Sequence, residues 1–137
     1  MLSSEEYIDQ RLVPEIEYYE NRSALNKRFF HVTSVVSIVS AVAVPIVAVV
    51  SDHFALAVIG GVASVAIASQ SLFKWHENWL KFRGSAEGLK KEQMYYLTRT
   101  GPYQGVADDA LEGILVVRVE DLISSEHETW QVEQKGK

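Results

Sequence analysis

Hydrophobic and polar positions are separated along this chain into long blocks instead of being mixed within each element. From Phe29 to Phe73 the only formally charged side chain is Asp52, and residues 1–28 and 74–137 carry all the others. A helix on the surface of a water-soluble core normally has a polar face. The separation therefore predicts two solvents, lipid for the middle of the chain and water for its ends.

Two apolar segments of membrane-spanning length form the middle block. Residues 29–50 and 54–73 each reach ~30 Å at ~1.5 Å per residue, which is the thickness of a bilayer core. Only residues 51–53 connect them, so the two spans must run antiparallel as a tight hairpin. The alternative is a buried hairpin in a soluble bundle, but neither run has a polar face and the remaining chain is too short to cover both.

The N-terminal block, residues 1–28, has the pattern of an amphipathic helix. Ser3 and Glu6 match a capping box, and an apolar stripe at helical spacing follows. The stripe consists of Ile8, Leu12, Ile16 and Tyr19. Pro14 interrupts it, and we expect this proline either to kink the helix or to lie in the first turn of a second one.

The second span leads into an aromatic and charged stretch, SQSLFKWHENWLKFRG. No glycine or proline interrupts it before Gly84, which predicts one helix that leaves the bilayer and continues into water as a stem over residues 74–99. Trp75 and Trp79 would share one face at headgroup level, with the Lys74 ammonium group extended to water. Lys27 and Arg28 precede the first span, and all five of these residues are predicted membrane-interface anchors.

A turn and a third polar-side helix complete the chain. Residues 100–107 contain two glycines and a proline, which indicate a turn. Residues 108–132 then carry a stripe with a spacing of about four, consisting of Leu111, Leu115, Val119 and Leu122. We expect the N-terminal helix, the stem and this helix to pack as a bundle. The stem would contribute Leu80, Leu89, Met94, Tyr95 and Leu97.

The predicted fold class is all-α, an integral membrane two-helix transmembrane hairpin with long cytoplasmic helical extensions and a C-terminal cytoplasmic helix. Lysines and arginines flank the polar ends of the spans, whereas residues 51–53 contain none. By the positive-inside rule both termini are cytoplasmic and the hairpin tip faces out. We therefore expect a multi-pass protein of the plasma (inner) membrane, with the lipid bilayer as its first partner.

Composition argues against several functional classes. There is no cysteine for a thiolate metal site, and the net charge of −5 is spread along the polar parts without the basic stripe that nucleic-acid binding needs. The histidines lack the spacing of a metal site, and there is no nucleophile motif or phosphate loop. We expect no catalytic residue, no metal and no cofactor.

Polar residues within the spans are candidates to line a pore. Hydroxyl and amide groups at these positions would line a weakly polar, water-filled path in an oligomer, whereas the alternative is that the serines bond to carbonyls of their own helix. The candidates are Ser34, Ser37 and Ser40 in the first span and Ser64, Ser69 and Gln70 in the second. The spans hold no deep Asp, Glu, Lys or Arg, which argues against a proton-coupled transporter.

Small residues at a spacing of four let helices approach closely in lipid. In the second span Gly60, Ser64 and Ala68 have this spacing, as do Ala57 and Gly61. They predict either an oligomer interface or the internal contact of the hairpin. At the tip, Asp52 and His53 would form an outer-mouth ring that concentrates cations in a closed oligomer, and a solvated turn is the alternative.

Three segments outside the spans have a recognisable pattern, namely YYENRSALNKRFF before the first span, WLKFRGSAEGLKKEQMYYLTRTGPY after the second, and RVEDLISSEHETW near the end. With these segments the chain resembles, over nearly its whole length, the SLATT family of bacterial two-transmembrane domains. The most specific residues are Arg83, Ser85, Glu87, Leu89, Lys90, Glu92, the turn Gly101–Pro102–Tyr103, and Arg118–Val119–Glu120 with Trp130. The resemblance implies a pore-forming membrane effector of a bacterial defence or nucleotide-signalling system, whose trigger comes from a separate signalling or sensor protein.

These patterns lead to two hypotheses for function. The first is a homo-oligomeric pore or ion channel, because a lone hairpin encloses no path and only copies of the chain around an axis would conduct ions. The second is a non-conducting membrane anchor or scaffold whose cytoplasmic helices recruit a signalling partner. A small transporter is a third and weaker hypothesis.

Overall fold

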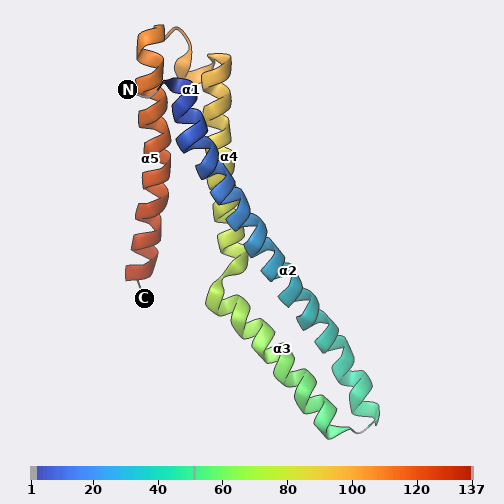
Figure 1. Ribbon diagram of the computed structural model, residues 1–137. Helices are drawn as coiled ribbons and strands as arrows, with labels where there is room; N and C mark the ends of the chain where they lie inside the picture. The colour runs from blue at the N-terminus through green and yellow to red at the C-terminus, as the bar shows by residue number, and fades with distance from the viewer. Residues whose placement is uncertain (1–2, 51, 137) are drawn as a thin grey trace. The chain divides into compact units, whose positions relative to one another are not determined.

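The computed structural model describes residues 3–50 and 52–136, which are all-helical with no strand. The elements are α1 (Ser4–Tyr7), a π-helical turn (Ile8–Leu12), α2 (Val13–Val50), α3 (His53–Phe73), α4 (Trp75–Thr98), a 3-10 turn (Gly101–Tyr103) and α5 (Asp108–Lys135) (Figure 1). The chain divides into two compact units. We call them the bundle, which comprises the described residues up to Asn21 and from Lys81 onward, and the hairpin, Arg22–Leu80.

The start of the bundle confirms the predicted capping box. The Ser3 hydroxyl accepts the Glu6 N–H at 3.3 Å, and the Glu6 carboxylate accepts the Ser3 N–H at 2.9 Å. Pro14 has no N–H for the helical ladder and its ring would clash with the preceding turn. The π-helical turn absorbs this conflict through a wider bond from the Val13 N–H to the Ile8 carbonyl. Pro14 therefore lies in the first turn of α2, the second of the two expected outcomes.

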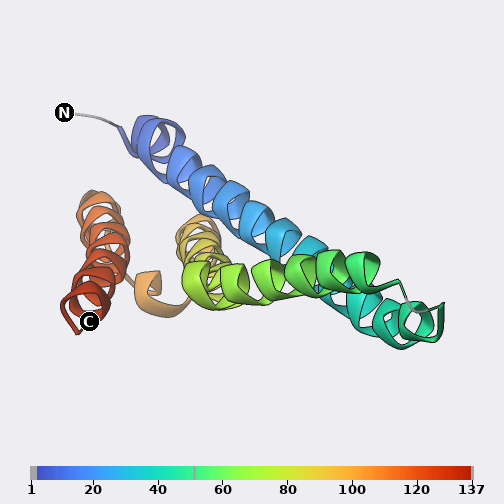
Figure 2. The same ribbon diagram turned by 90° about the horizontal axis from the view of Figure 1, so that it is seen from below.

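Three helical segments of the bundle, namely α1 with the start of α2, α4 and α5, enclose one apolar core (Figures 1 and 2). The predicted N-terminal stripe is confirmed, since all four of its residues are buried. On α5 three of the four predicted residues are buried, while Leu122 is only partly buried and Ile123 joins the core. The helix also extends to Lys135, three residues beyond the predicted end at 132.

The predicted apolar face of the stem was largely wrong. Leu89 is buried and Tyr95 partly buried, but Leu80, Met94 and Leu97 are each more than half exposed. The face that α4 buries consists of Phe82, Ser85, Ala86, Leu89 and Glu92. These residues repeat at the helical spacing of three and four. A hydrophobicity pattern misses this face because two of its members are polar and are buried with hydrogen-bond partners.

The continuous helix predicted across Ser69–Gly84 was also wrong. Helix α3 ends at Phe73, and Lys74 adopts the left-handed conformation with φ 49° and ψ 43° before α4 begins at Trp75. Backbone groups on both sides of the break have hydrogen-bond partners. The Lys74 N–H donates to the Gln70 carbonyl at 2.9 Å, and the Asn78 amide donates to the Phe73 carbonyl at 3.1 Å. Asparagine thus caps a helix end in place of the glycine that normally marks one.

The hairpin consists of two long apolar helices that could span a membrane. The apolar part of α2 and helix α3 run side by side in opposite directions (Figures 1 and 2). Only 6% of the most apolar stretch in each is buried, so this surface is not the core of a soluble bundle within the described residues. Large apolar side chains such as Val49 and Phe54 are more than three-quarters exposed. Such a surface is stable in lipid, where every backbone group is satisfied within its own helix.

Candidate functional site

The polar residues of the two spans form a hydrogen-bonded seam inside the hairpin. The Gln70 amide on α3 donates to the Thr33 hydroxyl at 2.7 Å and to the Ser34 hydroxyl at 3.0 Å, both on α2. An amide exposed to lipid is costly, and a partner on the neighbouring helix removes that cost. Thr33, which the sequence did not single out, therefore belongs to the same group as the predicted Ser34 and Gln70.

Most of the other pore-lining candidates have partners within the hairpin as well. Ser37 donates to the Thr33 carbonyl and Ser69 to the Ala66 carbonyl, each at 2.8 Å. Ser40 is buried, with 7% of its surface exposed. These contacts are those of the alternative considered above, in which serines bond within helices.

Ser64 differs from the other candidates because it lies on the outer face of α3. Its hydroxyl donates to the Gly60 carbonyl at 2.8 Å, but the residue remains exposed. At ~100° per residue it is about 200° around the helix from Ala66, which is buried. Its neighbours on this outer face are also small, and we call them together the α3 stripe. The stripe consists of Ala57, Gly61, Ser64, Ala68 and Ser71, all exposed.

The predicted helix-packing residues thus divide between two faces. Gly61, Ser64 and Ala68 belong to the α3 stripe, while Gly60 is partly buried. Open space surrounds the position of an added side chain at both Gly60 and Gly61. The hairpin's own contact instead buries Ala66 of α3 and Ser40 of α2. A close contact through the α3 stripe would therefore need a second molecule.

The tip of the hairpin has a local structural role. The Asp52 carboxylate accepts the Ala55 N–H at 3.1 Å and caps the N-terminus of α3, where a negative charge is favourable. His53 is the first residue of that helix and is exposed. Ser51, the remaining residue of the predicted turn 51–53, lies outside the described residues.

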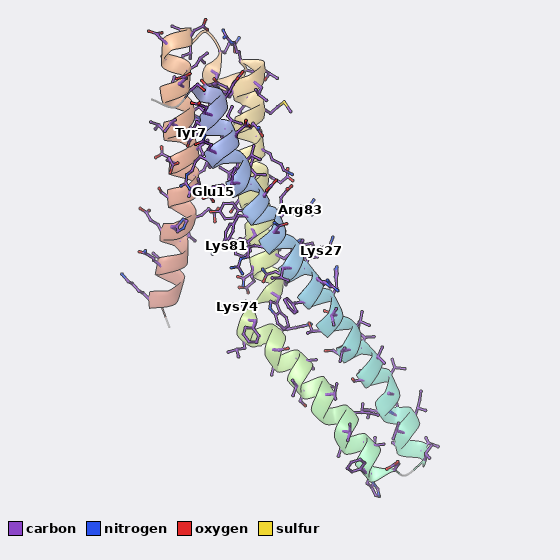
Figure 3. The ribbon with its side chains drawn as sticks, in the orientation of Figure 1. Tyr7, Glu15, Lys27, Lys74, Lys81 and Arg83 are labelled. Carbon is purple, nitrogen blue, oxygen red and sulfur yellow. The ribbon has the colours of Figure 1, made fainter. Side chains whose placement is uncertain are left out.

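Aromatic rings gather at the opposite, polar end of the hairpin. Trp75 stacks on Phe29 and Phe73, with centroids 5.2 and 5.3 Å apart. The Lys27 ammonium group lies over the Trp79 ring, 5.4 Å from its centroid. Arg28 is exposed beside Lys27, and the exposed Lys74 approaches Glu77 at 3.8 Å. These contacts bring the five predicted interface anchors to one end of this unit, where Figure 3 labels Lys27 and Lys74.

The bundle contains a buried ionic contact that sequence reasoning did not assemble. Glu92 of α4 accepts two hydrogen bonds from the Arg118 guanidinium of α5, at 2.7 and 2.9 Å, and one from the Tyr103 hydroxyl at 3.0 Å. The hydrogen bonds from Arg118 lower the pKa of Glu92, and burial together with Glu92 raises the pKa of Tyr103. All three residues had been noted for the family resemblance, but nothing in their spacing shows that they meet.

A second polar contact joins the N-terminal segment to α5. Arg11 and Tyr7 both donate to the Glu120 carboxylate, at 3.1 and 3.0 Å, and Arg11 also pairs with Glu15 at 2.8 Å. Burial, followed by the contact with Glu120, raises the pKa of Tyr7 to about 12, and the Arg11 hydrogen bond lowers the pKa of Glu120. Charged groups therefore hold together segments that are far apart in sequence.

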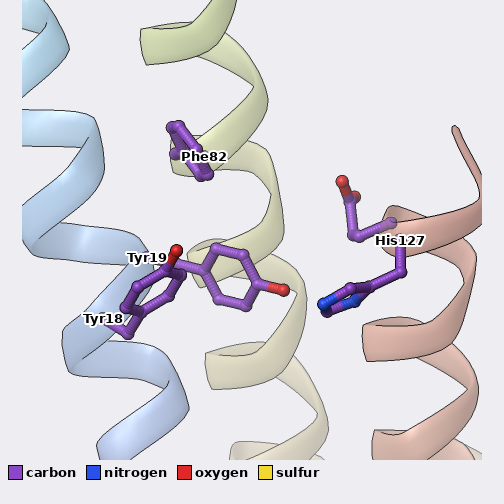
Figure 4. A pocket seen from close by; sticks show the side chains of 5 residues that line it. Tyr18, Tyr19, Phe82 and His127 are labelled. Atoms are coloured by element: carbon purple, nitrogen blue, oxygen red, sulfur yellow. The ribbon is translucent and has the colours of Figure 1, made fainter. Parts of the chain in front are cut away.

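An aromatic cavity of about 250 Å³ also lies in the bundle (Figure 4). Its lining comes from α2, α4 and α5 and consists of Tyr18, Tyr19, Phe82, Glu126 and His127. Across residues 3–50 and 52–136, no three His, Cys, Asp or Glu side chains are grouped to hold a metal ion. The described lining of the cavity consists of three aromatic rings, one carboxylate and one imidazole.

Comparison with known proteins provides one match. A family model with the description "Protein of unknown function (DUF4231)" covers residues 14–110, which include both apolar helices and α4. No curated protein matches the chain, and no solved structure does.

Proposed function

Because this chain belongs to the DUF4231 family, which is described only as proteins of unknown function, we propose its activity from the geometry: it is a homo-oligomeric membrane pore. The hairpin crosses the bilayer, and several copies associate around an axis to conduct ions. The resemblance to SLATT domains leads to the finer proposal of an effector in a bacterial defence or nucleotide-signalling system. The bundle would then hold the subunits together in the cytoplasm and receive the trigger from a signalling partner.

The α3 stripe is the observation that carries this proposal. It places two alanines, one glycine and two serines on the face of α3 that is opposite the hairpin contact. Small residues permit close helix contact in lipid, where packing and hydrogen bonds drive association. The Ser64 and Ser71 hydroxyls on this face are the polar groups that copies of the hairpin would present to a common axis.

Ion flux from proteoliposomes tests conduction. The full-length protein should release an entrapped ion or dye when it is reconstituted as a verified oligomer, and protein-free liposomes should not. An oligomer that shows no flux at any membrane potential, lipid composition or added nucleotide would contradict the pore.

Substitutions on the α3 stripe test the interface itself. Gly61→Leu and Ser64→Leu should shift the detergent-solubilised protein to smaller oligomers, because a bulky side chain prevents close approach. The matched control is Val65→Leu, which adds an apolar methylene beside the stripe at a position that is 70% exposed. Unchanged oligomer size in all three variants would place the interface elsewhere.

The hydrogen-bonded seam supports a second candidate, a non-conducting anchor that carries the bundle as a recruitment platform. Four of the pore-lining candidates form hydrogen bonds inside the hairpin and supply no continuous polar path, namely Gln70, Ser34, Ser37 and Ser69. In this case α2 and α3 hold the bundle at the membrane and a signalling protein binds the bundle.

Gln70→Leu tests whether the seam only stabilises the hairpin, as in an anchor, or also lines a conducting path. In an anchor, the substitution should lower the thermal stability of the hairpin by about 1 kcal/mol and leave flux at the background level. In a pore lined by Gln70, flux through the variant should change in rate or selectivity. Val65→Leu is again the matched control, because Val65 is exposed and lies outside both the seam and the α3 stripe.

A further inference from the structure

The polar end of the hairpin contains a group of hydrogen-bond donors gathered around one indole ring. His31 and His76 both meet the Trp79 ring edge-on, with centroids 5.8 and 5.6 Å away, and Lys27 lies over the same ring. We call these four residues the Trp79 cluster. His76 also packs on Phe30 with centroids 4.7 Å apart.

Two contacts of the Ser23 and Phe29 side chains hold this group together across two helices. The Ser23 hydroxyl of α2 donates to the Trp79 carbonyl of α4 at 3.3 Å, and Ser23 is buried. The stacking of Phe29 on Trp75 joins the same two helices one turn away. The Trp79 cluster is therefore positioned by packing on both sides, not by a single flexible side chain.

The charges of this region are unbalanced. Among the described residues neither Lys27 nor Arg28 forms an ion pair, and the imidazoles of His31 and His76 make no hydrogen bond to the protein. Glu77 is the one carboxylate in the sequence from 22 to 33 and from 73 to 80, and it faces Lys74. None of these four side chains, two basic and two imidazole, therefore donates a hydrogen bond to another described residue.

We propose that the Trp79 cluster, with Arg28 beside it, binds the phosphate group of an anionic phospholipid. The site lies where two apolar helices end, so a bound lipid would place its acyl chains along the hairpin and its phosphate among these donors. Basic residues attract anionic headgroups, and tryptophan is most stable at the same depth. This assignment rests on the membrane insertion proposed above and adds the headgroup chemistry that the polar end selects.

Lipid binding to the full-length protein in detergent micelles tests the assignment. Native mass spectrometry should show tighter binding of phosphatidylglycerol than of phosphatidylcholine. Lys27→Ala should weaken phosphatidylglycerol binding about fivefold, which corresponds to about 1 kcal/mol for one basic residue. Lys27→Arg should retain the preference, because it keeps the charge.

The bundle supplies a matched control for this experiment. Lys91 lies over the Tyr95 ring at 5.4 Å from its centroid, the same distance as between Lys27 and Trp79, but belongs to the other unit. Lys91→Ala should leave lipid binding unchanged. Equal binding of the two lipids, or equal losses in Lys27→Ala and Lys91→Ala, would overturn the proposal.

Inorganic phosphate distinguishes a soluble anion from a lipid. Binding of inorganic phosphate that depends on Lys27, together with equal binding of the two lipids, would overturn the lipid assignment. Absence of ion flux would contradict the pore only, and a chain that remains in the aqueous fraction without detergent would overturn both proposals.

Discussion

At the scale of single residues, Glu92 shows how the bundle uses charge. It is 6% exposed and accepts three hydrogen bonds, from Arg118 and Tyr103. A buried carboxylate without partners would be strongly destabilising, whereas one with a bidentate guanidinium specifies which helices meet and in what register. The contact joins α4, the turn at Gly101–Tyr103 and α5, so a local change there should affect the whole bundle.

Glu92→Gln is expected to destabilise the bundle. The amide cannot accept both Arg118 hydrogen bonds, and the loss of a hydrogen bond to a charged group costs about 2 kcal/mol, or about 10 °C in melting temperature for a domain of this size. Thermal unfolding of the full-length protein in detergent measures the effect. Glu87→Gln, the same change at an exposed position of α4, is the control and should melt with the wild type; equal melting of all three proteins would contradict this role.

The lowered pKa of Glu92 predicts an acid-sensitive bundle. In the unfolded chain this carboxyl takes up a proton near its ordinary pKa of 4.5, whereas in the folded protein it stays ionised to lower pH. Its stabilisation is therefore complete above that value and is lost as pH falls through the folded pKa. Melting curves from about pH 7 to about pH 3.5 should show the wild type and Glu92→Gln converging on acidification. A constant difference between them would contradict the linkage.

At the scale of elements, the important feature is the break between α3 and α4. Lys74 is one of two non-glycine residues with positive φ among the described residues, and the other, Arg99, directly follows α4. Both residues directly follow a helix, where a left-handed residue turns the chain and where glycine is usually found. A lysine in this conformation is strained because its Cβ approaches the following carbonyl oxygen.

Lys74→Gly should stabilise the hairpin relative to Lys74→Ala by about 1 kcal/mol, because glycine has no Cβ to clash. Both variants lose the ammonium group and its 3.8 Å approach to Glu77, so their difference reports the backbone alone. Thermal unfolding in the same detergent measures it. If Lys74→Ala proved the more stable, the junction would be helical, as the sequence pattern had predicted.

At the scale of the whole molecule, the proposed membrane topology is the property on which the function depends. The described residues divide into a hairpin with an apolar surface and a bundle held by apolar and ionic contacts. Lysines and arginines are present at one end of the hairpin sequence and absent from 51–53. The positive-inside rule therefore predicts a cytoplasmic bundle and a tip on the far side of the membrane.

Single cysteines test this orientation, because the chain has none of its own. In intact bacterial cells, an impermeant maleimide should label His53→Cys but not Asp109→Cys, at two positions that are exposed in the structure. Permeabilised cells should show both labelled, and the cysteine-free chain should show neither. Labelling of Asp109→Cys alone would invert the topology, and labelling of both in intact cells would contradict a spanning hairpin.

The sequence by itself determined the features that depend on the period and length of its apolar runs. It predicted an all-α chain and two uninterrupted apolar helices, and it identified the capping box at Ser3 and the buried stripe from Ile8 to Tyr19. These follow from local physics, since backbone hydrogen bonds and apolar periodicity act over a few residues. The positions of Trp75 and Trp79 on one helix face follow in the same way.

Only the tertiary structure decided which polar residues meet. Gln70 and Thr33 pair across the hairpin, Glu92 meets Arg118 and Tyr103, and Lys27 lies over Trp79, all between residues distant in sequence or on different elements. The break at Lys74 was likewise invisible to pattern, because neither glycine nor proline marks it. Hydrophobicity records the burial that a residue prefers, whereas a polar or strained residue is tolerated only when a distant partner satisfies it, and the fold alone supplies that partner.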